Sequence, residues 1–503
     1  MKARFRRLPA FSAEQFIAKL ENLPLSPPLL AFYFAFLLSL RELFEQLFFE
    51  TSFNIYRFNH HVFFFLPALL AGILGISWIG RIDIAKTARV VASGYVLIIL
   101  PPLIDHFLFL RNQPYEYLLP REFAKNFLTL FLFTPKAGSG IFLEIVMIIV
   151  LASAYVFLRT RSVRRALWTA GFLYLLAGLL ATPRLFLPLP SMTSPVVWQS
   201  RHVLYFCYDL VLSIIVGALF LWRVHPALPK SVFREIWSFR TLHFMVMAGA
   251  GLYSRKFFNV LAFPDVLGVF LTFTLMGLIW TATVLINNVY DLAIDRVANP
   301  GRPLVRQGIE PAFYLHLGLV LGIVACFVSL VLGMIALAIT IIALVSAIVY
   351  SVPPFRLRTR LLSNGFIAWG SVLGFYLGYF AAAPLLSPPV SGDMVRLSLV
   401  IFLALFFGSF SKDIKDYQGD LRGGIKTLVT VFGLPKGQKI ISAFLFLSLL
   451  TPLLIFHKTE DAIFMTATAA GISWLFYGKG KIGISFAGYI LVFLYCLGRM
   501  FLW

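Results

Sequence analysis

Long apolar runs constrain this chain more than any other feature of its sequence. Runs of roughly 17 to 25 residues, the length a helix needs to cross a hydrocarbon core about 30 Å thick, recur from residue 27 to the C-terminus. With 60% hydrophobic and only 13% charged residues, a water-soluble fold could not bury the apolar surface. Because backbone polar groups in lipid must bond within their own segment, the expected fold class is an all-helical, polytopic membrane protein.

Fifteen membrane-spanning helices are expected from the positions of these runs. The first six would lie near 27–49, 61–80, 88–106, 139–158, 166–183 and 203–222. The other nine would lie near 240–256, 264–290, 312–332, 334–350, 363–383, 396–411, 440–456, 462–477 and 483–502. The connector 223–243 contains Pro226 and Pro229, which interrupt a continuous helix. We therefore expect an N-terminal membrane region of unknown function, residues 1–235, and a second domain, residues 236–503.

The net formal charge of +21 has an explanation in membrane topology. Most Lys and Arg residues fall in alternate loops, as the positive-inside rule requires if the N-terminus is cytoplasmic. Attraction to anionic lipid is a second use of this charge, and we expect no nucleic acid partner. The predicted location is the cell (inner) membrane, with the N-terminus and the acidic motifs described next facing the cytoplasm. The sequence indicates no oligomeric state.

Two polar stretches that end apolar runs carry the strongest chemical signal. NNVYDLAID occupies residues 287–295 and DIKDYQGD occupies residues 413–420, and in each stretch Asp residues stand four positions apart. Residues four apart share one face of a helix, and both helices would end at the same membrane face. The expected stripes are Asn287, Asp291 and Asp295 on one helix and Asp413, Asp416 and Asp420 on the other.

Neighbouring carboxylates of this kind would repel one another strongly unless cations neutralise them. Oxygen ligands suit Mg²⁺, which is usually held by a few carboxylates together with the phosphate oxygens of a substrate. Basic side chains near both stretches would bind the remaining oxygens of a diphosphate. They include Arg296, Arg302, Arg306, Lys412, Lys415, Arg422, Lys426 and the segment YSVPPFRLRTR at residues 350–360. Alternatively, single charges form weak ion pairs at the surface, which is the preferred interpretation for Arg306, Arg360, Lys415 and Lys436.

These residues resemble the motifs of the UbiA-type intramembrane prenyltransferases, over about residues 236–503. That family carries an NDxxDxxxD motif after its second span and another Asp-rich motif after its sixth, where this chain has NNVYDLAID and DIKDYQGD. The segments NPGRPL, YSVPPFRLR and KDIKDYQGDLRGGIKTL are most similar to members that act on small aromatic or glycerol-phosphate acceptors.

The resemblance implies a nine-span bundle, preceded here by an additional bundle of about six helices. It implies transfer of a polyprenyl group from a prenyl diphosphate to such an acceptor, with two Mg²⁺ and release of diphosphate, as in lipid or quinone biosynthesis. The catalytic residues would be Asp291, Asp295, Asp416 and Asp420, and the metal ligands would be these four with Asn287 and Asp413. The diphosphate would be bound by Asn287, Arg302, Tyr350, Arg356, Arg358, Lys412 and Lys426.

The chain departs from the family pattern at three places. Asn288 stands where the family often has Asp, so the first metal position has one acid fewer. Arg356 follows Tyr350 by six positions, whereas the Tyr and basic residue of the family's aromatic-acid enzymes are four apart. Gln418 stands where related members often have Glu. These departures leave the acceptor open.

Catalysis at such a site would come from cations fixed around the leaving group, because ionising an allylic C–O bond builds negative charge on the diphosphate. The apolar, aromatic-rich bundle would shelter the carbocation from water. A second hypothesis is a transporter or channel that uses intramembrane acidic residues. It rests on Asp105, His106, Glu144 and Asp209 in the N-terminal half, although each could instead be a satisfied interhelical hydrogen bond.

The N-terminal half offers no motif that specifies a reaction. Adjacent His60 and His61 are not expected to bind one metal, because neighbouring positions on a helix point in different directions. Cys207, Cys326 and Cys496 lie far apart in apolar runs, which indicates neither a disulfide framework nor a metal site. The half could scaffold the second domain, bind a partner enzyme or deliver a lipid.

Overall fold

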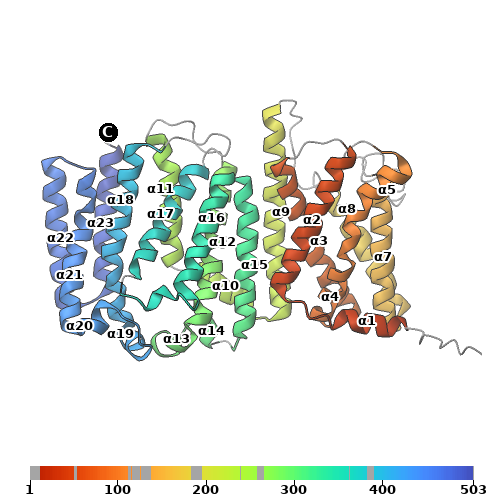
Figure 1. The fold of residues 1–503 in the computed structure, drawn as a ribbon, viewed down its shortest axis with the longest axis horizontal. Helices are drawn as coiled ribbons and strands as arrows, with labels where there is room; N and C mark the ends of the chain where they lie inside the picture. Colours follow the sequence, from red (N-terminus) through yellow and green to blue (C-terminus); the bar gives the residue numbers. More distant parts are fainter. Residues whose placement is uncertain are drawn as a thin grey trace, which may run out of the picture. The chain divides into compact units, whose positions relative to one another are not determined.

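Every regular element in the described part of the chain is a helix, which confirms the all-helical fold class there (Figure 1). The computed structural model describes residues 12–49, 54–111, 115, 125, 138–182, 195–237, 239–257, 266–306, 308–361, 363–381 and 390–501. The chain divides into two compact units, Met1–Pro229 (unit 1) and Lys230–Trp503 (unit 2). The division falls inside the connector in which the sequence placed a domain boundary.

Unit 1 is built mainly from long apolar helices. Its helices are α1 (Ala13–Glu21), α2 (Pro27–Phe49), α3 (Ile55–Gly80), α4 (Ile84–Gly94), the 3-10 turn η1 (Tyr95–Ile99), α5 (Leu100–Phe109), α7 (Gly138–Thr160), α8 (Val163–Leu180) and α9 (Pro195–Val224). Polar side chains begin several of them. Asn54 accepts hydrogen bonds from the first backbone N–H groups of α3, and Ser162 accepts one at α8. Such caps satisfy N–H groups that have no partner within the helix.

A buried carboxylate fixes α1 to α7. Glu21, at the end of α1, is buried and accepts hydrogen bonds from Arg159 Nε and Nη2, both at 2.7 Å. It also accepts one from Tyr155 OH at 3.1 Å. Ile17 of α1 packs beside Tyr155 in an apolar cluster that includes Ile76 of α3. The bidentate ion pair and this cluster hold the short amphipathic helix across the ends of the longer ones.

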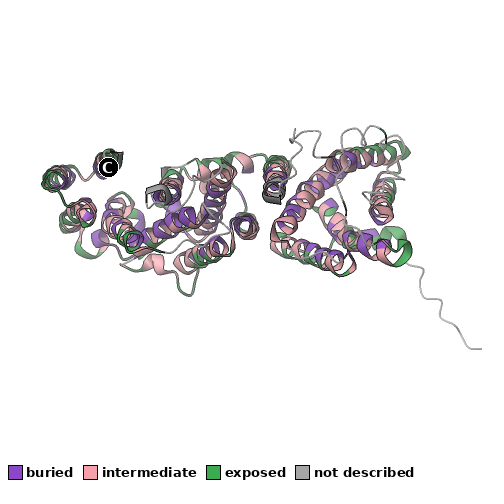
Figure 2. Cartoon of the chain, turned by 90° about the horizontal axis from the view of Figure 1, so that it is seen from above, coloured by how far each residue is buried: buried purple, intermediate pink, exposed green. Residues whose placement is uncertain are grey.

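Unit 2 combines long apolar helices with short helices after their ends. The elements are α10 (Leu228–Ile236), which contains the boundary with unit 1, α11 (Phe239–Phe257), α12 (Val266–Tyr290), α13 (Leu292–Ala298), α14 (Pro303–Arg306), α15 (Pro311–Val331), α16 (Met334–Ser351), η3 (Leu357–Thr359), α17 (Asn364–Ala381), α18 (Gly392–Gly408), η4 (Ser409–Lys412), α19 (Asp413–Arg422), α20 (Leu428–Phe432), α21 (Leu434–Leu450), η5 (Thr451–Leu454), α22 (Thr459–Lys479) and α23 (Ile482–Phe501). Their buried residues lie mostly on faces turned toward neighbouring helices (Figure 2).

Helices α11 and α17 pack with their backbones in contact. A Cβ atom at Gly251 would lie 1.9 Å from the carbonyl oxygen of Phe375, and one at Gly378 would lie 1.9 Å from that of Ala248. Only glycine permits this approach, as at the small-residue crossings of other membrane helices. Elsewhere in the unit, Phe410 of η4 joins α21 and α22 in one buried cluster, which fixes the chain just before α19.

A helix lies at each of the fifteen expected positions, although the span count itself stays a prediction. Among the described residues, eleven helical segments are long and apolar enough to cross a membrane. Length, hydropathy and the helical fold make this an integral membrane protein.

Candidate functional site

The sequence predicted that the first acidic stretch lies on one continuous helix, and the structure differs. Helix α12 ends at Tyr290, Asp291 adopts a non-helical conformation, and α13 begins at Leu292. The backbone bonds nevertheless keep helical spacing, from Asp291 N to Asn287 O at 2.9 Å and from Asp295 N to Asp291 O at 2.8 Å. The break occurs where the apolar run gives way to polar residues. The expected stripe therefore survives across a kink.

The second acidic stretch lies on a separate short helix that packs against the first. After α18 and the turn η4, helix α19 carries Asp413, Asp416 and Asp420, and α13 packs against α19. Contact is close at Gly423, where a Cβ atom would lie 3.0 Å from Ile294 Cγ1 of α13. The two short helices that bear the acids are thus direct neighbours.

Four of the six acidic or amide residues expected to bind metal are buried. Asp291 and Asp295 are each 1% exposed, and Asp413 and Asp420 are each 4% exposed. On α19, Asp413 interacts electrostatically with Asp416, Asp420 and Lys412. Carboxylates this well buried must be compensated by positive charge, because their desolvation is costly.

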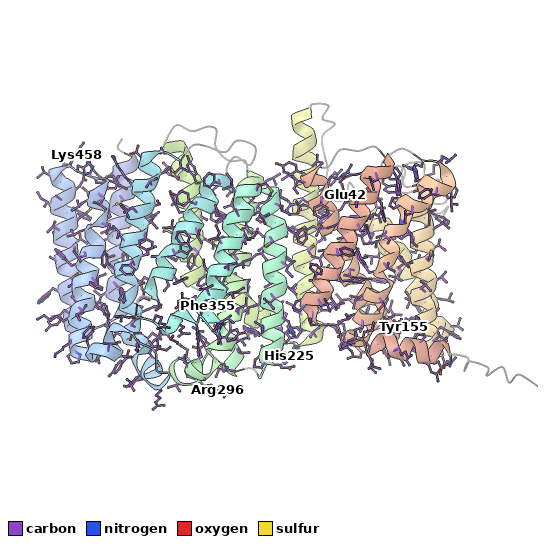
Figure 3. The ribbon with its side chains drawn as sticks, viewed as in Figure 1. Glu42, Tyr155, His225, Arg296, Phe355 and Lys458 are labelled. Atoms are coloured by element: carbon purple, nitrogen blue, oxygen red, sulfur yellow. The ribbon has the colours of Figure 1, made fainter. Side chains whose placement is uncertain are left out.

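Arginine side chains from the α16–α17 connection provide part of that compensation. Arg358 forms an ion pair with Asp291, and it also interacts electrostatically with Asp420 on α19. Arg356 Nη2 lies 3.8 Å from Asp291 Oδ1 and donates to the backbone oxygen of Tyr290 at 2.9 Å. Arg358 therefore acts on carboxylates of both clusters. Figure 3 labels Arg296 and Phe355 at the same end of the unit 2 helices.

A second polar chain links the first cluster to α10. Arg302 Nη1 donates to Asp295 Oδ2 at 2.7 Å and also to Asn288 Oδ1. Asn288 Nδ2 in turn donates to Glu235 Oε1 at 2.9 Å. Asn288 stands where the family often has an acid. Glu235 thus supplies a carboxylate beside this position.

Other predicted site residues occupy varied surroundings. Asn287 Oδ1 accepts a hydrogen bond from Ser351 Oγ at 3.0 Å. The ring of Tyr350 packs against Phe366 at a centroid distance of 5.9 Å. Lys426 is exposed, and its backbone N–H donates to the Thr359 carbonyl at 3.2 Å, which joins the chain after α19 to η3. The diphosphate-binding roles of Asn287, Tyr350 and Lys426 stay predictions.

The donor atoms around the carboxylates suit a hard divalent cation such as Mg²⁺. Asn364, at the start of α17, donates from Nδ2 to Asp413 Oδ2 at 3.3 Å. Its own Oδ1 is buried and has no hydrogen-bond partner in the described part of the chain. This amide oxygen and the neighbouring carboxylates together form a set of oxygen ligands, the kind that Mg²⁺ prefers.

Sequence reasoning missed Glu235, Ser351 and Asn364. Glu235 is the only acid in the connector 223–243, which was a usable signal. Ser351 and Asn364 lie at helix ends without any local pattern that marks them, and only tertiary contacts bring them to the acidic clusters.

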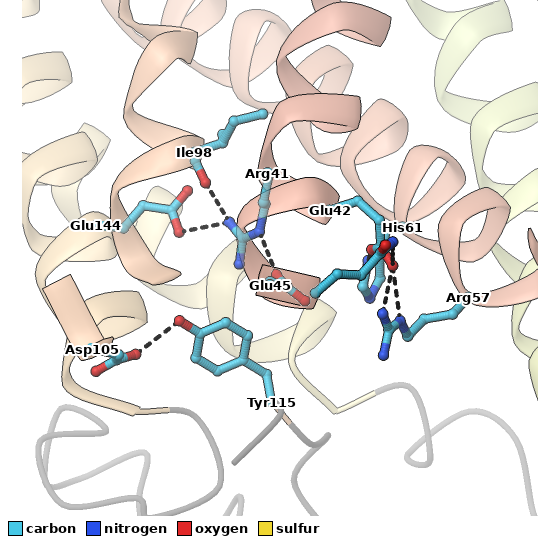
Figure 4. A network of polar contacts seen from close by, with 10 residues as sticks. Arg41, Glu42, Glu45, Arg57, His61, Ile98, Asp105, Tyr115 and Glu144 are labelled. Atoms are coloured by element: carbon cyan, nitrogen blue, oxygen red, sulfur yellow. Dashed lines mark hydrogen bonds and ion pairs between the residues drawn. The ribbon is translucent and has the colours of Figure 1, made fainter. Parts of the chain in front are cut away.

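In unit 1, three acids that suggested transport have partners. Asp105 accepts from Tyr115 OH at 2.9 Å and from the Gly140 N–H at 2.8 Å, as Figure 4 shows for the tyrosine. Glu144 accepts from Arg41 at 3.3 Å. Asp209 lies 2.9 Å from His60 Nδ1. These contacts favour structural hydrogen bonds and ion pairs over a conduction path.

Comparison with known proteins locates the relationship in unit 2. Residues 242–482 match the model of the UbiA prenyltransferase family. Digeranylgeranylglyceryl phosphate synthase of Sulfolobus acidocaldarius is 29% identical over 33% of this chain and 57% of its own length. The enzyme of the same name from Methanothrix thermoacetophila is 29% identical over 42% of this chain and 76% of its own.

Other relatives include a plant enzyme. A chloroplastic 2-acyl-4-prenylphloroglucinol 6-prenyltransferase of Humulus lupulus is 27% identical over 29% of this chain and 38% of its own length. A solved UbiA homologue from Archaeoglobus fulgidus, bound to DMAPP and Mg²⁺, aligns with 52% of this chain and 98% of its own at 16% identity and a TM-score of 0.41. The family assignment therefore rests on the sequence match. Residues 242–482 of this membrane protein match the UbiA prenyltransferase family.

Proposed function

We propose that unit 2 transfers a polyprenyl group from a prenyl diphosphate to a small acceptor within the membrane, with Mg²⁺ as cofactor. The observation that carries the proposal is the meeting of two acidic helices, α13 and α19, around Arg358. Both helices lie inside the segment that matches the family.

The carboxylates on α13 and α19 would hold the cations, with Asn287 and Asp413 as further ligands and Asn364 Oδ1 as a candidate beside them. Bound Mg²⁺ would neutralise the diphosphate and stabilise the negative charge that forms on it as the allylic C–O bond breaks. We propose two ions, because the acidic groups come from two separate helices.

Basic side chains would bind the oxygens of the leaving group. Arg358 is the best placed, because its guanidinium interacts with carboxylates on both helices. Lys412 lies within electrostatic range of Asp413 and Asp420. Arg356 would assist from the same connection as Arg358, and Arg302 would keep Asp295 oriented. Charge-assisted bonds of this kind are stronger than neutral ones and favour a departing diphosphate.

The apolar helices would shelter the prenyl chain and its cation. Phe244 of α11 and Trp280 of α12 pack with ring centroids 4.5 Å apart. Aromatic faces attract carbocations by about 1 kcal/mol or more, and exclusion of water prevents hydrolysis.

The acceptor is proposed to be of the glycerol-phosphate or aromatic type. The relatives named above, by name, synthesise digeranylgeranylglyceryl phosphate or transfer a prenyl group to an acylated phloroglucinol, which supports both classes. We further propose that the protein lies in the cell membrane with the site on its cytoplasmic side, as the distribution of Lys and Arg predicts.

The proposal is tested by product identification. Full-length protein in lipid nanodiscs is incubated with Mg²⁺, labelled geranylgeranyl or farnesyl diphosphate, and a panel of glycerol phosphates and aromatic acids or phenols. We expect release of diphosphate and a prenylated product identified by mass. Solute flux in proteoliposomes without release of diphosphate from any donor would overturn the proposal in favour of transport.

A further inference from the structure

Unit 1 contains a partly open cavity of about 370 Å³. Small-molecule pockets typically measure about 300 to 1,000 Å³. Most of its wall is apolar and comes from α3, α4, α7 and α8, with Phe65, Leu69, Ile76, Val91 and Leu173 among the lining residues. The lining runs from Glu45 to Tyr155, and Figure 3 labels Tyr155 and Glu42, which lies one turn from Glu45 on α2, toward opposite ends of the unit 1 helices. The cavity is therefore elongated along the helices.

One wall of the cavity is polar and is built from residues of α2 and α7. Arg41, Glu45 and Glu144 line the cavity and are 5%, 4% and 5% exposed. Arg41 Nε donates to Glu45 Oε1 at 3.0 Å, and its Nη1 donates to Glu144 Oε2 at 3.3 Å and to the Ile98 carbonyl at 2.9 Å (Figure 4). Three buried ionic groups thus meet at one wall of an apolar cavity.

Hydrogen-bond acceptors exceed donors on this wall. Among the residues that the structure describes, Arg41 is the hydrogen-bonding partner of both Glu45 and Glu144, so each carboxylate keeps an oxygen for another donor. One guanidinium also faces two carboxyl groups. Because an acceptor withdrawn from water without a donor costs free energy, the wall is complementary to a group that donates hydrogen bonds.

A metal ion is a weaker match. Glu42, Glu45 and His61 offer ligand atoms within 4.8 Å of one another. However, Glu42 already accepts from Arg57 Nη2 at 2.6 Å, and Glu45 already pairs with Arg41. A divalent cation there would lie against two fixed guanidinium charges. A hydroxyl adds no positive charge beside Arg41 and Arg57, and a primary ammonium adds one charge where a divalent cation adds two.

We propose that this cavity binds a single-chain amphiphile whose headgroup donates hydrogen bonds to Glu45 and Glu144. The headgroup is an alcohol or a primary ammonium, and the apolar chain lies along α3, α7 and α8. The volume equals that of about twelve water molecules at about 30 Å³ each, and a methylene group is of similar size. A carboxylate or phosphate headgroup is rejected, because it would face the surplus of acidic groups.

Gly72 provides a selective way to fill the cavity. It lies on α3 in the lining, and a Cβ atom there would meet no atom within 4 Å. Gly72→Leu is therefore expected to occupy ligand space, because its Cβ atom meets no neighbour. Gly171→Leu is the matched control, because Gly171 on α8 also has open space, is exposed, and is not part of the lining.

The experiment uses full-length protein in lipid nanodiscs and a photoreactive dodecanol as probe. Labelled peptides are identified by mass spectrometry, and competition is measured with dodecanol, dodecylamine, dodecanoate and Zn²⁺. We expect labelling of α3, α7 or α8 that falls at least tenfold with excess dodecanol or dodecylamine and persists with dodecanoate. Gly72→Leu should abolish it, whereas Gly171→Leu should not. Thermal unfolding of both variants establishes that they are folded.

A second variant separates the two headgroups. Glu144→Gln keeps an acceptor oxygen but removes the negative charge that would pair with an ammonium group. Competition by dodecylamine should therefore weaken at least tenfold, whereas competition by dodecanol should be retained. Equal competition by dodecanoate, labelling that survives in folded Gly72→Leu protein, or competition by Zn²⁺ without competition by either amphiphile would overturn the proposal.

Discussion

At the scale of single residues, Asn288 and Glu235 form a unit. The amide of Asn288 accepts a hydrogen bond from Arg302 and donates one to Glu235 at 2.9 Å. The carboxylate beside this position is therefore that of Glu235 on α10, and residue 288 itself is uncharged. Replacing Asn288 by an acid would place two carboxylates in contact, with a repulsion of about 4 kcal/mol at an effective dielectric constant of 20.

We therefore predict that N288D lowers both the thermal unfolding midpoint, by about 3 °C or more, and prenyl transfer. The double variant N288D/E235Q should recover most of both losses, because the second change removes one of the repelling charges. Thermal unfolding of the wild type, N288D, E235Q and the double variant in nanodiscs gives the coupling energy. Additive effects would show that Glu235 and Asn288 act independently.

Arg358 carries the second residue-level prediction. R358A should raise the KM for prenyl diphosphate by about tenfold to a hundredfold, because charge-assisted hydrogen bonds contribute about 1.5 to 3 kcal/mol. The control is R360A, an exposed arginine two positions away on the same connection. Steady-state kinetics at saturating acceptor separate KM from kcat. Equal effects of the two changes would remove Arg358 from the diphosphate site.

At the scale of elements, the packing of α13 against α19 sets the distance between the acidic clusters. Gly423→Val would force Ile294 away, since a Cβ atom already approaches it to 3.0 Å. We expect prenyl transfer to fall about 100-fold with the protein still folded, as displacements near 1 Å do at catalytic sites. Gly471→Val on α22 is the control, because its Cβ atom meets nothing within 4 Å. Transfer rates of the two variants decide the matter.

The helices and the four-residue spacing of the acids could be predicted from sequence, because length, hydropathy and periodicity are local properties. The non-helical conformation of Asp291 and the packing of α13 against α19 could not, since neither follows from the spacing of the acids. The partners Glu235 and Asn364 lie far along the chain from the residues they contact. The pairing of Arg41 with Glu144 likewise joins residues that no sequence spacing relates.

At the scale of the whole molecule, the two compact units suggest separable roles. A fragment that starts at Lys230 keeps Glu235, and we predict that it retains prenyl transfer within about threefold of the full chain, or about 0.6 kcal/mol. A fragment that starts at residue 240 lacks Glu235 and should lose more than tenfold. Both are assayed in nanodiscs after confirmation that they are monodisperse. An inactive but folded first fragment would assign unit 1 a part in the reaction.

The most direct test of the central claim is Mg²⁺-dependent diphosphate release by single-carboxylate variants. Asp291→Ala and Asp416→Ala remove one acid from each cluster, whereas Asp393→Asn changes an exposed acid that pairs with Arg396 on α18. We predict that Mg²⁺ stimulates release by the wild type and by Asp393→Asn, and that both alanine variants lose it while remaining folded. Full activity in either alanine variant would contradict an active site formed by α13 and α19.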